Sequence, residues 1–183
     1  MEKRPEENRS SGLIKVAITG PESTGKSSIA KQLAEYFHTV FVPEFAREYI
    51  DKNNRPYTYS DILEIAKSQL QRETELYPKA NKIIFCDTEF LVTKIWSENA
   101  FKKCEEWILK TIKDHKYDLY LLMNIDLEWE SDPQREHQHL REYFFNLYYN
   151  ELSLRKLPFK IISGQKEERL KNAVMAVNEF IIC

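Results

Sequence analysis

Five short apolar runs recur along the chain, and longer stretches with helical spacing separate most of them. The runs are LIKVAIT (13–19), TVFV (39–42), KIIFC (82–86), LYLLM (119–123) and FKII (159–162). Short runs rich in β-branched residues indicate strands. KIIFC is nearly all apolar, as expected of a central parallel strand that is buried on both faces. The pattern therefore predicts five strands.

Helical spacing of apolar residues appears near 26–37, 60–76, 90–98, 101–114 and 165–181. The second of these stretches has Ser60 as its predicted N-cap, with Asp61 in the first turn. Strands separated by helices indicate an α/β fold with right-handed crossovers. We predict a doubly wound, five-stranded parallel sheet with helices on both faces. Such sheets bind ligands beyond the carboxyl ends of their strands.

Length and composition favour one globular domain. The chain has 183 residues, of which 42% are apolar and 31% charged, enough for one sizeable core and short for two domains. We expect this domain to occupy residues 13–183. Residues 1–12 carry charges, Pro and Ser without the apolar run of a signal peptide, and we expect them to be a disordered lead-in.

Charge, hydropathy and cysteines narrow the function classes. The net charge of −2 argues against a nucleic-acid partner, because proteins that bind nucleic acid normally carry a basic excess. No apolar run approaches the roughly 20 residues that span a bilayer, so no membrane partner is expected. The three cysteines, Cys86, Cys104 and Cys183, are scattered, which favours the cytoplasm. The pattern gives no indication of the oligomeric state.

The first predicted strand runs into TGPESTGKSSIA (19–30), which contains the phosphate-binding pattern G-x-x-x-x-G-K-[ST]. A strand before it and a helix after it are the context that a P-loop requires. Lys26 would reach the β- and γ-phosphates, and Ser27 would bind Mg²⁺. The chain lacks the N-K-x-D stretch that reads guanine in GTPases, so ATP is the expected nucleotide. The predicted ATP-binding residues are Gly20, Pro21, Glu22, Ser23, Thr24, Gly25, Lys26, Ser27 and Ser28.

Carboxylates follow two other predicted strands. Asp87 would hold Mg²⁺ with Ser27 or accept the proton of the acceptor hydroxyl, unless it only caps the next helix. Glu89 is a further candidate for substrate binding. After the second strand, Glu44 would face the acceptor hydroxyl, and Arg47 would steady it or the phosphoryl group. The alternative for this second pair is a surface ion pair of little consequence.

A polar segment after the fourth strand, at about 126–142, has the position of a P-loop kinase lid. Arg135 and Arg141 are the residues expected to close over the transferring phosphate, within a helical lid. The alternative is a solvated helix whose charges compensate one another. His137 and His139 lie two residues apart, which on a helix would point them in different directions, so no metal site is expected from them.

Three tryptophans and one P-loop acid complete the candidates. Trp96 and Trp129 would flank a flat ring of the substrate, although a single aromatic is more often a packing residue, as we expect for Trp107. Glu22 should point away from phosphates, which would repel it. We expect Glu22 on the acceptor side, near a cation such as Arg47 or the pyridinium of the acceptor, with a solvent-facing position as the alternative.

Taken together, GPESTGKSSIAKQLAEYF, VPEFAREYI, CDTEFLVTKIWSE, YDLYLLMNIDLEWESDPQREH and LREYFFNLYYNEL resemble the ribosylnicotinamide kinase domain of the NadR family. The resemblance runs from about residue 13 to the end of the chain. It implies a P-loop kinase fold, MgATP as the phosphate donor and nicotinamide riboside as the acceptor. It also supports roles for Lys26, Ser27, Asp87, Arg135 and Arg141, and it favours stacking of Trp96 or Trp129 on the nicotinamide.

Two departures from the family follow from the same sequence. Full-length NadR proteins also carry an adenylyltransferase domain, and some carry a helix-turn-helix domain, for which 183 residues leave no room. The lid has Pro133 where many relatives have Gly. The expected function is phosphorylation of the nicotinamide riboside 5′-hydroxyl. The alternatives are a kinase of another nucleoside or small metabolite, and a P-loop regulatory ATPase that acts through a protein partner.

Overall fold

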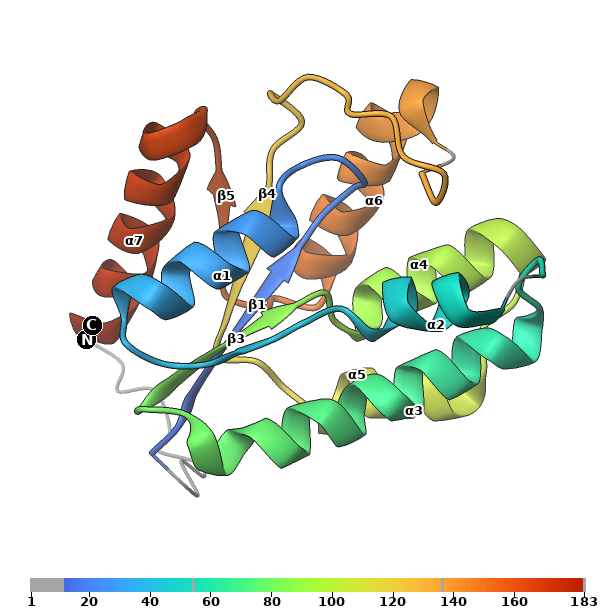
Figure 1. Ribbon diagram of the computed structural model, residues 1–183, viewed down its shortest axis with the longest axis horizontal. Helices are drawn as coiled ribbons and strands as arrows, with labels where there is room; N and C mark the ends of the chain where they lie inside the picture. Colours follow the sequence, from blue (N-terminus) through green and yellow to red (C-terminus); the bar gives the residue numbers. More distant parts are fainter. Residues whose placement is uncertain (1–11, 54, 136, 183) are drawn as a thin grey trace.

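Five parallel strands form one sheet, in the spatial order β2-β3-β1-β4-β5 (Figure 1). The computed structural model describes residues 12–53, 55–135 and 137–182, so all but Gly12 of the predicted lead-in lies outside the described residues. The strands are β1 (Ile14–Thr19), β2 (Phe41–Val42), β3 (Ile83–Asp87), β4 (Leu119–Met123) and β5 (Phe159–Ile162). The predicted five-stranded parallel sheet is confirmed.

Helices cover both faces of this sheet. They are α1 (Lys26–Tyr36), α2 (Phe45–Asn53), α3 (Tyr59–Leu76), α4 (Phe90–Phe101), α5 (Glu106–Asp114), α6 (Arg141–Leu154) and α7 (Lys166–Ile182). Val16 and Ile18 of β1 pack with α1 and α7, whereas Ala17 packs with α3, α4, α5 and α6. This alternation follows from the two-residue period of a strand and gives the protein one core on each face.

Strand register brings the candidate residues to one edge of the sheet. Ile18 of β1 pairs with Asp87 of β3 and with Leu121 of β4, and Val42 of β2 pairs with Cys86. The two neighbours of the P-loop strand, β3 and β4, and the next strand, β2, therefore end near the same level. The loops that follow β1, β2, β3 and β4 meet there, as expected for a parallel sheet.

Several helix boundaries differ from the predicted ones. The N-cap of α3 is Thr58 rather than Ser60, because Asp61 accepts the Thr58 backbone N–H (2.6 Å) and completes a capping box. The predicted helix at 101–114 begins only at Glu106, since Lys102 has a left-handed φ of 58° and ends α4. Helix α2 was not predicted.

The predicted helical lid is wrong in its secondary structure. Within 126–142, the described residues before Gln138 form an irregular loop, followed by a 3₁₀ turn (Gln138–Leu140) and the first residues of α6. Pro133 and the carboxylates of this segment give it no apolar face with which to pack a helix. Residues 126–142 are called the lid segment below. It crosses the molecule above the P-loop (Figure 1).

Candidate active site

The P-loop connects β1 to α1, as the motif predicted. Gly20 has a φ of 129°, and a side chain there would approach the Met123 carbonyl to 3.0 Å. Gly25 has a φ of 77° and is the N-cap residue of α1. The Pro21 carbonyl accepts hydrogen bonds from Thr24 Oγ1 (2.8 Å) and Lys26 Nζ (2.7 Å). The loop is thus shaped at its glycines and fixed by its own side chains, with the amino end of a helix beneath it to favour an anion.

Lys26 lies among carboxylates from two other strand ends. Burial lowers the pKa of Lys26, while the negative charges of Glu44 and Asp87 oppose that shift. Burial, and then the charge of Asp87, raises the pKa of Glu44, and Lys26 opposes this. The three side chains are therefore close enough to influence one another. Perturbed acids and a perturbed lysine in one place are typical of catalytic sites.

Within this group, Asp87 has a buried carboxylate oxygen that accepts no hydrogen bond from the described residues. Its side chain is buried, and Oδ1 has no hydrogen-bond partner among the described residues. Burial raises the pKa of Asp87, and the neighbouring Ser27 and Lys26 oppose the shift. A carboxylate oxygen beside a P-loop hydroxyl is a suitable pair of ligands for Mg²⁺, which prefers oxygen donors.

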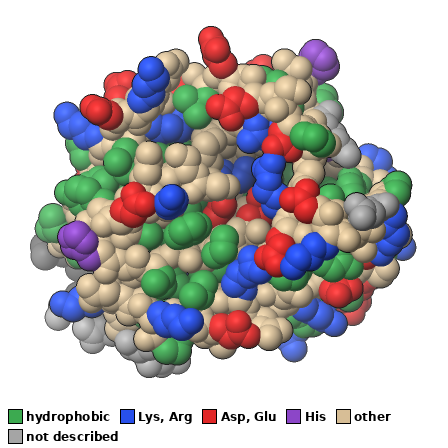
Figure 2. Space-filling model, in the orientation of Figure 1, with side chains coloured by type: hydrophobic (Ala, Val, Ile, Leu, Met, Phe, Trp, Pro, Cys, Tyr) green, Lys and Arg blue, Asp and Glu red, His purple; other side chains and the backbone are tan. Residues whose placement is uncertain are grey.

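A cavity of about 670 Å³ opens beside these residues. All nine predicted ATP-binding residues, 20–28, line one part of it. Its lining also includes rings and aliphatic side chains, namely Tyr57, Val92, Ile95, Trp96, Phe144 and Tyr148. Figure 2 shows acidic and basic side chains gathered around a hollow on this face. The cavity can therefore hold an anionic group at one end and a flat apolar ring at the other.

Most of the predicted acceptor-side residues reach this cavity. Glu44, Arg47, Trp96 and Trp129 all line it. Trp96 meets the Tyr57 ring edge-on at 4.8 Å, and the Trp129 ring lies 5.9 Å from the guanidinium carbon of Arg141. Trp107 instead packs against the core beside Phe90, as predicted.

The position of Glu89 does not support the substrate contact that was predicted for it. Its buried carboxylate accepts the Leu91 backbone N–H (2.6 Å) and the Thr19 hydroxyl (2.9 Å), and it is the N-cap of α4. It is absent from the lining of the cavity. Glu89 therefore caps a helix and ties it to β1, which argues against the predicted substrate contact. The capping role considered for Asp87 belongs to Glu89.

The predicted lid arginines differ in position. Arg135 lines the cavity and donates to the Glu130 carbonyl (2.6 Å). Arg141 does not line it, since its guanidinium donates to the carbonyls of Leu127 (2.8 Å) and Ser23 (3.1 Å). These contacts join the lid segment to the P-loop, and the phosphate contact of Arg141 stays a prediction.

Two other predicted contacts involve different partners. Arg47 forms an ion pair with Asp132 of the lid segment. Glu22 lines the cavity, but its described contacts are with His137, whose backbone N–H donates to Oε2 (3.1 Å). Arg47 was one of the two cations expected beside Glu22, and the pyridinium of the acceptor was the other. His137 of the lid segment, for which no metal-binding role was expected, lies beside Glu22 instead of Arg47.

Arg169 was missed entirely. It is buried in α7 and donates to Asp126 Oδ1 (2.6 Å) and to the carbonyls of Thr24 (3.0 Å), Asn124 (2.7 Å) and Gly164 (2.8 Å). It thereby joins the P-loop to the ends of β4 and β5. The available signal was a charged residue four positions before Ala173, on the apolar face of its helix.

The described residues contain no cluster of three or more His, Cys, Asp or Glu side chains that could hold a metal ion by themselves. A Mg²⁺ ion at Ser27 and Asp87 would thus depend on the phosphates for further ligands. None of the described helices is long and apolar enough to cross a bilayer.

Curated relatives confirm the resemblance to NadR. The trifunctional NAD biosynthesis/regulator proteins NadR of Salmonella typhimurium and Escherichia coli are each 30% identical to this chain over 124 residues, which is 66% of the chain. The chain spans only 30% of the length of those relatives. The match therefore supports a P-loop kinase-type domain and leaves the activities of the whole relatives to separate tests.

Solved structures show the same fold. A NadR protein in complex with NR has a TM-score of 0.81 at 24% identity, over 93% of this chain and 50% of that one. A NadR protein with NAD and AMP-PNP gives 0.76 at 23% identity, with the same coverage. Thymidylate kinase from Ehrlichia chaffeensis gives 0.63 at 14% identity, over 93% and 99%. The fold is that of P-loop kinases.

A family model for an AAA domain matches residues 15–169, from the second residue of β1 to Arg169 in α7. This range contains the P-loop, the carboxylates at the strand ends and the lid segment. The chain belongs to this AAA domain family.

Proposed function

We propose that the protein transfers the γ-phosphoryl group of MgATP to the 5′-hydroxyl of nicotinamide riboside, giving nicotinamide mononucleotide for NAD salvage. One observation carries the proposal: a single cavity joins the P-loop and Glu44 to a wall of aromatic side chains that includes Trp96. The acceptor is a flat cation joined to a ribose, and rings together with carboxylates suit such a cation. The NadR protein solved with NR is the related case.

In the proposed reaction, the 5′-oxygen attacks the γ-phosphorus as the bond to the β-phosphate oxygen breaks, and ADP leaves. Glu44 is assigned as the acceptor of the hydroxyl proton, because it lines the cavity and burial raises its pKa, which makes it a stronger base. Asp87 is assigned to the metal instead, because it neighbours Ser27 and is absent from the cavity lining.

The positive groups have complementary roles. Lys26 would bind the transferred phosphate, and Arg135 would neutralise charge that develops on it from the lid side. Mg²⁺ held by Ser27 and Asp87 would supply further neutralisation at the β- and γ-phosphates. Trp96, Trp129 and Arg47 would contact the acceptor. Positioning and electrostatics carry most of a phosphoryl transfer, which asks for little covalent chemistry from the protein.

The test measures ADP release from MgATP with nicotinamide riboside, with a panel of other nucleosides and with buffer alone. We expect release at least about tenfold faster with nicotinamide riboside than with buffer, and a phosphorylated product by mass spectrometry. Faster release with another nucleoside would overturn this acceptor. Slow release that no acceptor changes would favour the regulatory ATPase.

A matched pair of variants tests the ring-binding wall. Trp96→Leu should raise KM for nicotinamide riboside by about tenfold and leave KM for ATP unchanged, because each aromatic contact is worth on the order of 1 kcal/mol or more. Trp107→Leu in α5 is the control, because Trp107 packs against the core beside Phe90 and does not line the cavity. Equal changes in both variants would contradict the assignment of Trp96.

A further inference from the structure

Two P-loop residues, Glu22 and Ser23, are the docking points of the lid segment. The Ser23 hydroxyl accepts the backbone N–H of Glu130 (2.9 Å), and the Ser23 carbonyl accepts from Arg141 (3.1 Å). The Glu22 carboxylate accepts the backbone N–H of His137 (3.1 Å), and its other oxygen lies 3.6 Å from His137 Nδ1. The lid segment thus meets the tip of the P-loop at both of its ends.

These contacts use parts of the loop that phosphate does not need. The Lys26 ammonium and the Thr24 hydroxyl are held by the Pro21 carbonyl, at the base of the loop. A carboxylate at Glu22 would repel a phosphate, and Ser23 has a φ of 55°, which the loop adopts at its turn. The acid that is awkward in a phosphate-binding loop has a direct use as an acceptor for the lid backbone.

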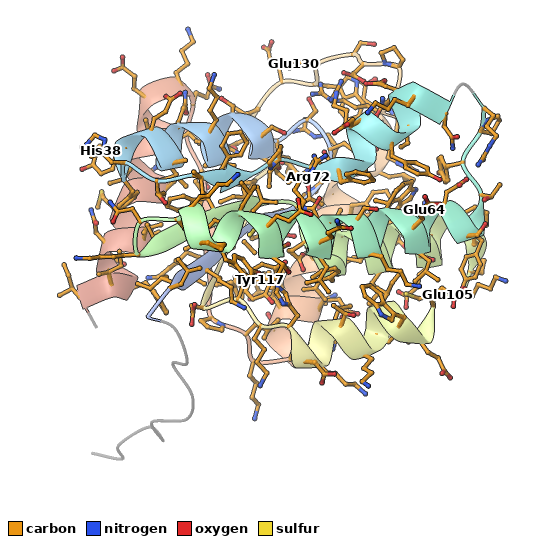
Figure 3. The ribbon with its side chains drawn as sticks, turned by 60° about the horizontal axis from the view of Figure 1, so that its bottom comes forward. His38, Glu64, Arg72, Glu105, Tyr117 and Glu130 are labelled. Atoms are coloured by element: carbon orange, nitrogen blue, oxygen red, sulfur yellow. The ribbon has the colours of Figure 1, made fainter. Side chains whose placement is uncertain are left out.

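The docking fixes where Arg135 lies. Arg135 donates to the Glu130 carbonyl (2.6 Å) and lies 3.4 Å from the Ser23 hydroxyl. Its positive charge contributes to the lowered pKa of Lys26, after the larger effect of burial. Glu130, labelled in Figure 3, is therefore joined to Ser23 through its N–H and to Arg135 through its carbonyl. Loss of the first contact would release the second from the P-loop.

The far part of the lid segment is attached elsewhere. Asp132 pairs with Arg47, and Gln134 contacts Asp51, both in α2, while Asn99 of α4 lies 3.3 Å from His137 Nε2. These attachments would hold the lid segment near α2 and α4 without the P-loop. The contacts at Glu22 and Ser23 hold the part of the lid segment that carries Arg135 against the P-loop.

We propose that Glu22 and Ser23 are positioning residues, which act through the lid segment to hold Arg135 over the transferring phosphate. The proposal rests on the proposed kinase function and assigns different roles to two parts of the P-loop. Residues 24–27 would bind the phosphates, and residues 22 and 23 would bind the lid.

Hydrogen–deuterium exchange tests the docking without any acceptor. Ser23→Gly removes the hydroxyl and suits the left-handed backbone, and Glu22→Ala removes the carboxylate. The peptide that contains the Glu130 amide should exchange about tenfold faster in Ser23→Gly, because that amide loses its acceptor. The peptide that contains the His137 amide should do the same in Glu22→Ala. Ser23→Asn and Glu22→Gln, which keep an acceptor oxygen, should restore much of the protection. Exposed His139, in the adjacent turn, supplies the control His139→Gln. Thermal unfolding checks that each variant folds.

Kinetics then separate positioning from phosphate binding. Ser23→Gly and Glu22→Ala should lower kcat about tenfold and change KM for ATP less than about twofold, with partial recovery in the two conservative variants. Unchanged lid exchange, or faster exchange with unchanged kcat, would overturn the proposal. So would a rise in KM for ATP that matches the fall in kcat. If no nucleoside is phosphorylated but the exchange changes occur, the kinase assignment and the positioning role fail, whereas the docking contacts stand.

Discussion

Two buried carboxylates, Glu73 on α3 and Asp87 at the end of β3, differ in their hydrogen bonding. Glu73, in the last turn of α3, accepts from Tyr117 Oη (2.7 Å) and Tyr77 Oη (2.9 Å) and lies 2.9 Å from His115 Nε2. Asp87, at the carboxyl end of β3, has an oxygen without a partner among the described residues. Figure 3 shows Tyr117 near α3 and α5, well apart from Glu130 on the lid segment.

This difference in hydrogen bonding indicates a structural role for Glu73 and a ligand-binding role for Asp87. A buried polar group whose hydrogen bonds are all made stabilises a specific packing, whereas an unpaired one costs free energy. The Glu73 cluster belongs to the first kind, and none of its residues lines the cavity beside the P-loop. Asp87 belongs to the second kind, next to Ser27 and Lys26. An unmet hydrogen-bond capacity at a strand end is retained where a ligand can use it.

Asp87→Asn should separate activity from stability most strongly. We expect kcat to fall about a thousandfold, because a neutral amide cannot hold Mg²⁺ or balance its charge, and such groups contribute several kcal/mol to the transition state. Unfolding midpoints in urea should stay the same or rise. Burial raises the pKa of Asp87, so its ionised form is the costly one in the folded state, and the amide removes that cost.

Exposed Asp114, at the end of α5, supplies the control for this variant. Asp114→Asn should leave kcat and the urea midpoint unchanged. If Asp87→Asn kept full activity, the assignment of Asp87 to the metal would be wrong. If it unfolded the protein, the contrast with Glu73 would fail.

Glu73→Ala should produce the opposite result. The free energy of unfolding should fall by about 3 kcal/mol, because two tyrosine hydroxyls and the His115 ring lose their buried acceptor and a cavity remains. Below its lowered melting temperature the variant should keep the wild-type kcat. Glu75→Ala, an exposed position two residues further along α3, controls for the loss of a glutamate from that helix. A large loss of kcat in the folded variant would contradict the comparison.

Glu89 is an intermediate case, since it is buried at the ligand edge and is nevertheless hydrogen-bonded. Burial raises its pKa to about 7, against the opposing hydrogen bonds from Leu91 and Thr19. In the unfolded chain the carboxyl titrates near its ordinary value of 4.5. The folded state therefore takes up a proton in this window. Stability from Glu89 is present below about pH 4.5 and is lost as the pH rises to about 7.

Glu89→Gln should remove this pH dependence. Relative to the variant, the wild type should lose on the order of 2 kcal/mol of unfolding free energy between about pH 5 and about pH 8, measured by urea titration. Other buried acids titrate in both proteins, so the difference between the two isolates Glu89. Parallel pH profiles would show that Glu89 is ionised throughout.

Sequence reasoning predicted the parts of this molecule that local patterns determine. The five strands have apolar runs of their own, and the P-loop has fixed residue spacing, so both were found. Parallel strands share an edge, and that rule placed Glu44 and Asp87 beside Lys26. Helix α2 has no buried residue and therefore gave no apolar period to detect.

The misassigned residues depend on tertiary contacts. Asp87 and Glu89 are two positions apart and similar in chemistry, and only the packing of α4 against β1 decides which one caps the helix. Arg141 was expected at the phosphate, but it also donates to the carbonyls of Leu127, in its own segment, and of Ser23, which is far away in sequence. No local pattern records which distant carbonyls lie unpaired.

Tyr77→Phe removes a single hydroxyl from the Glu73 cluster and should have the smallest effect of these variants. The ring stays in place, and only the hydroxyl that donates to Glu73 is removed, so the free energy of unfolding should fall by about 1 kcal/mol, with kcat unchanged. Tyr143→Phe, which removes a hydroxyl from an exposed ring on α6, should change neither. Glu73 keeps Tyr117 and His115 as partners, so the loss should be well below that of Glu73→Ala. An equal loss in the two variants would mean that the cluster acts as one unit, in which each donor is needed to keep the carboxylate buried.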